Sequence, residues 1–181
     1  MPEERWDVLR RERVLQHPFV TVDMEQVRLP DQRVIPNWPI VNMRNYINAL
    51  VLNRGGQAMI ISGYKHGLGR SSWQVLGGYI EDGEDPLAAA QRELLEETGY
   101  HSDDWQRLGS FVIDANRHGG IGHFFLARDA RPIAKPDHND LEQFVVRWVA
   151  IDELKQALAD GRVAIISYAI NISLGLLALG C

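Results

Sequence analysis

The alternation of apolar and polar residues predicts a chain built mainly from short strands. The turn signal Pro30-Asp31-Gln32 joins the first two strands into a leading hairpin, and Asn53-Arg54-Gly55-Gly56 joins the next two into a second hairpin. Strands outnumber helices in the pattern and alternate with them along the chain. The predicted strands are residues 18–29, 33–41, 47–52, 58–61, 73–76, 108–113, 121–127 and 144–151.

Three helices complete this pattern. The clearest one has Asp85 as its N-cap, Pro86 at its first position and Gly99 at its end. Asp152 is the expected cap of a second helix that runs to about Ala159. The uncharged segment 163–181 predicts a buried amphipathic helix, with a membrane-spanning helix as the alternative. The fold class is therefore α/β (α+β), a mixed β-sheet between helices.

Length and charge limit what kind of protein this is. The 181 residues suit one domain with a short appended element. A formal net charge of −5 argues against a broad nucleic-acid-binding face, so we expect no nucleic-acid partner. Cys181 has no second cysteine with which to form a disulfide, and residues 1–13 contain no apolar signal-peptide core. We expect a reduced, cytoplasmic protein without a membrane partner.

The first predicted helix carries a cluster of acidic residues. Glu93 and Glu97 lie one turn apart on it, at ~100° per residue, and Glu96 is close by. Carboxylates held so close repel one another, and a divalent cation would relieve the repulsion. Such oxygen ligands suit Mg²⁺ or Mn²⁺, which can withdraw charge from a diphosphate and acidify a bound water. A solvated acidic surface helix is the alternative interpretation.

The spacing around this cluster resembles the Nudix box, G-x5-E-x7-R-E-U-x-E-E-x-G-U, in which U is a bulky apolar residue. Residues 78–100 match every specified position, with Tyr100 accepted as the last. The resemblance implies the Nudix fold and a magnesium-dependent hydrolase. Arg92 would orient the carboxylates by ion pairing, and Glu84 would brace the preceding loop. The implied metal ligands are Glu93, Glu97, Glu96 directly or through water, and the backbone carbonyl of Gly77.

Outside the box, the order of several short motifs resembles the ADP-ribose pyrophosphatase branch. That branch implies a homodimer that exchanges N-terminal strands, and aromatic residues that clasp the adenine. Residues 1–44 would then form a dimerising extension with a β-hairpin, and residues 45–181 the Nudix hydrolase domain. The motifs are Pro18-Phe19, Leu29-Pro30-Asp31, Trp38, Tyr64-Lys65-His66-Gly67 and Trp73.

Five residues become substrate-binding candidates through this resemblance. A base can stack on Trp38 or Phe19, although ordinary hairpin packing explains Trp38 equally well and Phe19 also fits a core strand. Lys65 matches a basic position near the phosphates, and Arg70 is a further basic candidate. Asn116 stands where the branch has a proline, so the pocket could suit a different nucleotide sugar.

The general base of this branch comes from an acidic loop after the box. Glu142 aligns best with it, and Asp140 is the alternative. The implied reaction is hydrolysis of ADP-ribose to AMP and ribose 5-phosphate. Alternatives are another nucleotide sugar or dinucleoside polyphosphate, and a non-catalytic nucleotide-binding module. A Nudix isomerase would need a catalytic cysteine, whereas Cys181 is terminal.

Overall fold

The computed structural model describes residues 5–136 and 144–181. The chain divides into two compact units. One contains the residues up to Asn45 together with Phe111–Ile121, and the other contains Tyr46–Ser110 and Gly122–Cys181. The long strands β9 (Asp104–Asp114) and β10 (His118–Pro132) therefore contribute residues to both units.

The first three strands of the chain, in the N-terminal unit, pair antiparallel to one another in sequence order. The predicted leading hairpin is confirmed as β2 (Val20–Arg28) and β3 (Val34–Met43), in which Glu25 pairs with Trp38. A strand that the sequence did not predict, β1 (Asp7–His17), pairs with β2. Every residue of β1 is exposed, so it has no buried face to produce the alternation by which a strand is recognised.

Strand β1 is attached to β2 through charged side chains. The buried positions of β2 include Asp23 and Glu25, which are only 3% and 5% exposed. Arg13 forms an ion pair with Asp23, and Arg11 lies 2.6 Å from a carboxylate oxygen of Glu25. The hydrogen bond from Arg13 lowers the pKa of Asp23, which keeps that carboxylate charged. Ion pairing thus takes the place that apolar packing has in most strands.

The second unit is built around β4 (Tyr46–Asn53). This strand runs parallel to β10 and antiparallel to β7 (Leu76–Tyr79), and Asn48 is paired with Phe124 on one side and Gly77 on the other. The predicted mixed sheet is therefore confirmed. The remaining strands are β5 (Ala58–Lys65), β6 (Arg70–Gln74), β8 (Tyr100–His101) and β11 (Phe144–Val149).

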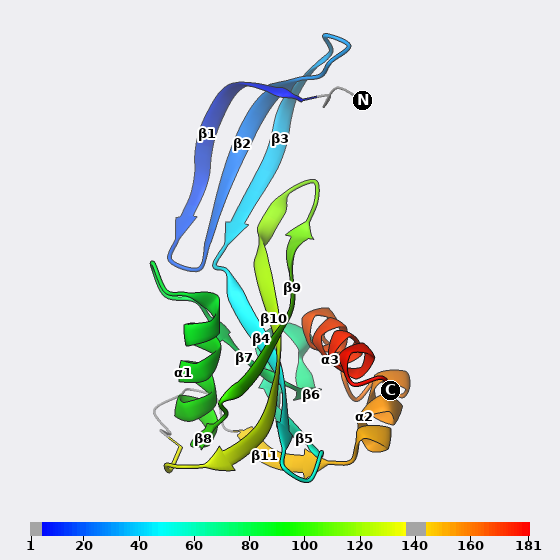
Figure 1. The fold of residues 1–181 in the computed structure, drawn as a ribbon. Helices are drawn as coiled ribbons and strands as arrows, with labels where there is room; N and C mark the ends of the chain where they lie inside the picture. Colours follow the sequence, from blue (N-terminus) through cyan, green and yellow to red (C-terminus); the bar gives the residue numbers. More distant parts are fainter. Residues whose placement is uncertain (1–4, 137–143) are drawn as a thin grey trace. The chain divides into compact units, whose positions relative to one another are not determined.

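Helices cover both faces of this sheet (Figure 1). Helix α1 (Pro86–Thr98) lies on one face, and α2 (Ile151–Ala159) and α3 (Ile166–Ala178) lie on the other. Successive residues of β4 point to opposite faces, so Ala49 packs in the cluster beneath α1 and Leu50 packs in the cluster beneath α2 and α3. The predicted arrangement of a sheet between helices is confirmed.

The ends of α1 lie where the sequence predicted them. Asp85 Oδ1 accepts hydrogen bonds from the backbone N–H groups of Leu87 (2.9 Å) and Ala88 (3.2 Å). Gly99 ends the helix in a left-handed conformation, with φ of 72°, and its N–H donates to the Leu95 carbonyl. The Gly99 carbonyl accepts from the N–H groups of Ile133 (2.9 Å) and Ala134 (3.1 Å), which fixes this end of the helix against the chain after β10.

We expect Gly99→Ala to destabilise the protein by about 2 kcal/mol more than Gly83→Ala. Both glycines have a left-handed backbone, which costs an alanine roughly 1–2 kcal/mol. A methyl group at Gly99 would also overlap the backbone carbonyl of Ala134, whereas at Gly83 it would meet open space. Urea denaturation of the two variants measures the difference. Equal midpoints would show that the contact with Ala134 is unimportant.

The second helix begins earlier than its expected cap. The N-cap is Ala150, without a side-chain hydrogen bond, so the prediction that Asp152 caps this helix is wrong. Asp152 lies in the first turn instead, where a negative charge still interacts favourably with the helix dipole. Ile151, which was predicted as the last residue of the preceding strand, belongs to helix α2. That strand ends at Val149.

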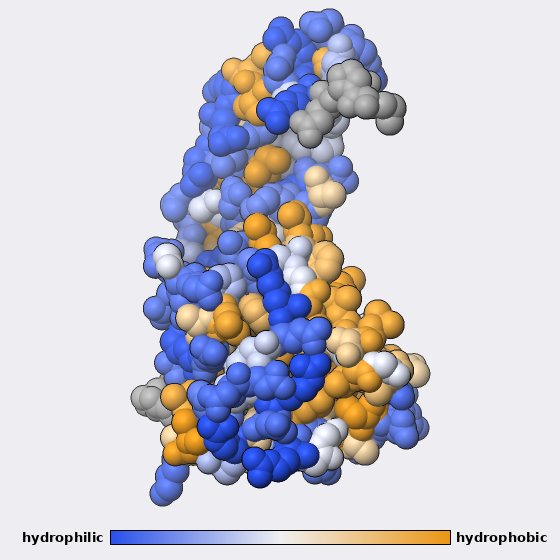
Figure 2. Space-filling view, in the orientation of Figure 1, coloured by the Kyte–Doolittle hydropathy of each residue, from blue (hydrophilic) through white to orange (hydrophobic). Residues whose placement is uncertain are grey.

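The uncharged C-terminal segment forms α3, a helix of 13 residues. It buries Asn171 and Ile172 against the sheet, as predicted, but it is not amphipathic, because Ile166 and Leu177 are 77% and 73% exposed. Apolar side chains are accordingly visible over α3 (Figure 2). Among the described residues, no helix is long and apolar enough to cross a membrane.

Candidate active site

Two consecutive glycines of β7 allow the acidic flank of α1 to approach the sheet. A methyl group at Gly78 would overlap the carboxyl group of Glu93, and one at Gly77 would overlap the side-chain amide of Asn48. The Glu93 side chain is consequently pressed against the strand and is only 14% exposed. Asn48 in turn donates a hydrogen bond to the Leu76 carbonyl at 3.3 Å. A larger residue at Gly77 or Gly78 would therefore displace Asn48 or Glu93.

Arg92 holds the carboxylates of this flank in a network. Its Nε and Nη2 atoms donate to the two oxygens of Glu84 at 2.9 and 3.0 Å. Its Nη1 donates to Glu93 at 2.9 Å and to Glu96 at 3.1 Å, and Nη2 also donates to the Tyr79 carbonyl at 3.1 Å. The bidentate pairing with Glu84 fixes the plane of the guanidinium, so the positions of the other carboxylates follow from it.

Burial and ion pairing shift the pKa values of these carboxylates in opposite directions. Burial raises the pKa of Glu93, although the hydrogen bond from Arg92 opposes this shift. The pKa of Glu84 is lowered, first by its hydrogen bond with Arg92 and then by the backbone N–H of Glu81. The described residues contain no pre-formed cluster of three His, Cys, Asp or Glu side chains that could hold a metal ion. Arg92 stands among the carboxylates, and Glu96 is 53% exposed.

Glu97, the last acidic residue on this flank, faces a different set of groups. It lines a small cleft of about 20 Å³ together with Gly77 and Lys65. Gln74 and Tyr168 also line this cleft, and the Tyr168 hydroxyl donates to Gln74 Oε1 at 3.3 Å. The fold thus brings a carboxylate, an ammonium group and the β7 backbone to one polar space, which has room for about one water molecule.

Sequence reasoning missed the residues that complete this cleft. Gln74 lies in the predicted strand 73–76, where no motif assigns it a role. Its burial, at 4% exposed, is unusual for a polar side chain and marks it as a structural partner. Tyr168 lies on α3, far away in the sequence, and no local pattern connects it with β7. Asn48, which faces Gly77, lies between the apolar residues Ile47 and Ala49 of β4.

The other candidates in this unit lie at different positions. Arg70 is the cross-strand partner of Lys65 in the β5–β6 ladder, and its guanidinium lies 3.5 Å from the Ser71 carbonyl. Arg70 does not line the cleft that contains Lys65. Both candidates for the general base, Glu142 and Asp140, fall outside the residues that the structure describes.

Three substrate-binding candidates belong to the N-terminal unit. Trp38 Nε1 donates to the backbone carbonyl of Asn116 at 3.0 Å, and its ring makes an edge contact with Trp6 at 5.1 Å. Phe19 lies at the turn between β1 and β2, and it is 51% exposed. It is therefore not a core strand residue, which was the alternative that its sequence position favoured. The Phe19 ring lies 5.7 Å from that of His17.

Comparison with known proteins agrees with this geometry. The family model of the NUDIX domain matches residues 43–168. A CMP-5'-(N-acetyl-N-hydroxy-3-aminopropyl)phosphonate hydrolase of Streptomyces rubellomurinus is 30% identical, over 97% of this chain and 84% of its own. ADP-ribose pyrophosphatases of Mycobacterium tuberculosis and Bacillus subtilis are 23% and 25% identical, over 90% and 76% of this chain and 79% and 74% of their own.

The fold has a close counterpart among solved structures. A crystal structure of an ADP compounds hydrolase superposes with a TM-score of 0.85 at 18% sequence identity, and the match covers 98% of this chain and 95% of the other. The family match spans the box, the glycines of β7 and most of the sheet that positions them. The resemblance read from residues 78–100 is thereby confirmed, and the chain belongs to the NUDIX family as a Nudix pyrophosphohydrolase.

Proposed function

We propose that this enzyme hydrolyses the diphosphate linkage of a nucleotide sugar, with ADP-ribose as the first candidate and AMP and ribose 5-phosphate as the products. The observation that carries the proposal is the cleft in which Glu97, Gly77 and Lys65 meet. A lysine beside a carboxylate can balance the charge of a phosphate that a cation also contacts. The names of the two ADP-ribose pyrophosphatases among the relatives support this choice of substrate.

Magnesium, or manganese in its place, is the cofactor that the donor set fits. Carboxylate and carbonyl oxygens are hard ligands, and Gly78 leaves just enough space for the Glu93 carboxyl to lie on the strand. We assign the ion to Glu93, Glu97 and the Gly77 carbonyl, with Glu96 contributing directly or through a water. When bound, it would draw negative charge from the diphosphate and favour ionisation of a water.

The protein's own groups would position the reactants. Arg92 keeps the carboxylates apart and oriented, and Lys65 would bind a phosphate oxygen. Glu142 is our candidate for the residue that accepts the proton of the attacking water. We assign recognition of the remainder of the substrate to Arg70, Trp38, Phe19 and Asn116, with the chain acting as a homodimer.

A second substrate class has specific support. The Streptomyces rubellomurinus relative, which matches nearly the whole chain, is named for hydrolysis of a CMP-linked phosphonate. Such a compound also joins two phosphorus groups through an oxygen, so the same cleft could serve its hydrolysis. This makes a nucleoside monophosphate joined to a phosphonate the alternative to ADP-ribose.

A coupled assay tests both substrates. Alkaline phosphatase releases phosphate from AMP and ribose 5-phosphate but not from intact ADP-ribose, so phosphate appears only after the diphosphate is cut. We expect release with ADP-ribose or a CMP-linked phosphonate in the presence of Mg²⁺, and none after chelation. Other nucleotide sugars and dinucleoside polyphosphates test breadth. If none of these compounds is turned over, the binding-module alternative replaces our proposal.

A further inference from the structure

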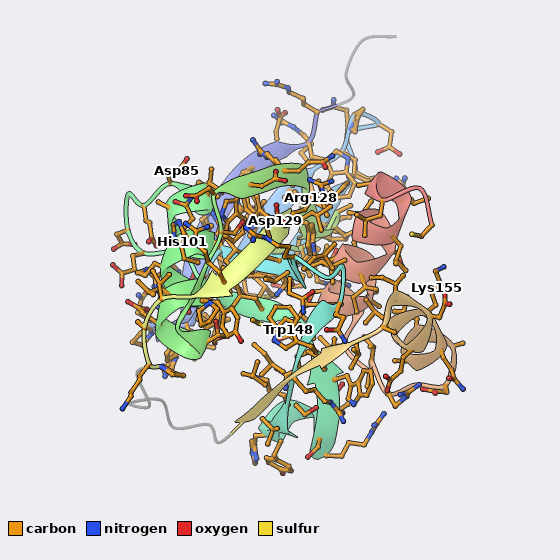
Figure 3. The ribbon with its side chains drawn as sticks, turned by 60° about the horizontal axis from the view of Figure 1, so that its bottom comes forward. Asp85, His101, Arg128, Asp129, Trp148 and Lys155 are labelled. Atoms are coloured by element: carbon orange, nitrogen blue, oxygen red, sulfur yellow. The ribbon has the colours of Figure 1, made fainter. Side chains whose placement is uncertain are left out.

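A second, larger pocket lies in the unit formed by Tyr46–Ser110 and Gly122–Cys181. Its volume is about 410 Å³, within the range of ~300–1,000 Å³ that small-molecule sites occupy. Its walls come from the β4–β5 turn, β8, the end of β10 and β11, and it shares no lining residue with the cleft that contains Glu97. Its lining includes the side chains of Arg54, Tyr100, Asp129, Arg131 and Trp148. Figure 3 looks onto this end of the unit, with Asp129 and Trp148 labelled.

The pocket has an aromatic wall. The rings of Tyr100 and Trp148 meet edge to face, with centroids 5.4 Å apart and an angle of 67° between their planes. The Trp148 indole N–H donates to the Tyr100 hydroxyl at 3.4 Å, so the hydroxyl proton stays available for another acceptor. Both residues also pack against the core beneath α1, which fixes the wall in place. A fixed, partly exposed aromatic surface suits a planar ring.

Two guanidinium groups stand beside this wall. Arg131 donates to Asp103 at 2.8 Å from an exposed position, and the pairing leaves other N–H groups of its fork for a ligand. Arg54 lies in a turn that is closed by the hydrogen bond from Gln57 N–H to Asn53 Oδ1 at 3.0 Å. In the described part of the chain, Arg54 makes no hydrogen bond or ion pair of its own. Two such groups on a chain with a net charge of −5 form a local site for an anion.

An acidic residue is turned toward the same pocket by an irregularity in β10. The register of β10 with β4 shifts between Ala127 and Ala130, and Asp129 between them has a left-handed backbone, with φ of 53°. Bulges of this kind redirect a side chain and occur often beside functional sites. A carboxylate here can accept hydrogen bonds from hydroxyl groups of a sugar, while repelling an anion from its own side of the pocket.

From this arrangement we infer that the pocket is a second nucleotide site, which binds a nucleoside monophosphate. The base would lie against Trp148 and Tyr100, the ribose hydroxyls would donate to Asp129, and Arg54 and Arg131 would bind the phosphate. The base, the ribose and the phosphate would thus contact aromatic rings, a carboxylate and guanidinium groups, respectively. The inference does not depend on the proposed substrate, because this site contains no group of the reaction cleft.

Calorimetric titration of the full chain with AMP in EDTA tests this inference, since AMP has no diphosphate linkage to be cut and EDTA removes any metal through which it would bind at the reaction cleft. We expect the Arg54→Ala, Arg131→Ala double variant to bind AMP about tenfold more weakly or less still, the loss expected for a charge-assisted hydrogen bond. Deoxy-AMP should bind more weakly than AMP, because it lacks one ribose hydroxyl. Glu97→Gln should bind AMP with the same affinity as the unaltered chain, because Glu97 does not line this pocket.

Arg128→Ala is the matched control, because Arg128 is the neighbouring arginine on β10 but does not line the pocket. It pairs instead with Gln106 and Asp104. An equal loss of affinity in Arg128→Ala, or unchanged affinity in the double variant, would overturn the inference. Inorganic phosphate that binds as tightly as AMP would do the same. Amide shifts of Gly55 and Ala130 on adding AMP to the unaltered chain provide a readout that needs no variant.

Discussion

Glu97→Gln should reduce hydrolysis by at least about 10³-fold while the protein remains folded. Glutamine has the size of glutamate but lacks its charge, so it cannot supply an anionic ligand at the cleft that Glu97 shares with Gly77 and Lys65. Glu97 lies outside the network of hydrogen bonds that Arg92 makes with Glu84, Glu93 and Glu96. Steady-state kinetics with the substrate found in the screen, and thermal unfolding of the same sample, measure both parts of the prediction.

Glu96→Gln serves as the control for this result. Glu96 is the neighbouring glutamate, but its side chain is 53% exposed and does not line the cleft. We expect it to lower the rate by about tenfold, as is typical when a group that supports a metal site is lost. If Glu97→Gln were as active as the unaltered enzyme, the cleft would not be the reaction site. A loss as large for Glu96 as for Glu97 would mean that exposure does not distinguish their roles.

Gly78→Ala should lower activity by about 100-fold or more with little loss of stability. Its methyl group would overlap the Glu93 carboxyl, which is the end of a flexible side chain and can rotate away. The backbone at Gly78 has no left-handed conformation to strain. The substitution should therefore displace the Glu93 carboxylate and lower the free energy of unfolding only slightly. Kinetics, urea denaturation and Mn²⁺ affinity by electron paramagnetic resonance together separate these effects.

Gly67→Ala is the control for the glycine substitution itself. A methyl group at Gly67 would meet nothing within 4 Å, so activity and Mn²⁺ affinity should remain unchanged. Retained Mn²⁺ affinity in Gly78→Ala would contradict our assignment of Glu93 as a ligand. Loss of cooperative unfolding in Gly78→Ala would instead show that the strand cannot accept the methyl group, and the stated stability would be wrong.

The parts of the fold that sequence could predict are those that local chemistry determines. Helix α1 was predicted at both ends because a capping carboxylate at Asp85 and a left-handed glycine at Gly99 act within one turn of the chain. The β4–β5 turn, with its paired glycines, was predictable for the same reason. Strand β1 was not, because charged pairs with β2 replace the apolar face that a strand pattern requires.

For the candidate site, sequence named the acidic flank but could not supply its surroundings. The spacing of Glu93 and Glu97 on one helix follows from the chain alone. The contact between Glu93 and Gly78 depends on how α1 packs against β7, and the presence of Tyr168 in the cleft depends on where α3 crosses the sheet. Asp152 illustrates the opposite error, since this good capping residue lies inside the helix, which begins two residues earlier than predicted, at Ile151.

Helix α1 is fastened at its middle and at its C-terminal end, and this limits how the gene can change. Arg92 ties the middle of the helix to Glu84 and to the Tyr79 carbonyl, and Gly99 ties its last turn to Ile133 and Ala134. Inserting or deleting one codon between these anchors would turn the carboxylates by ~100° and shift them by ~1.5 Å. Such a frame-preserving change would separate the acidic flank from β7.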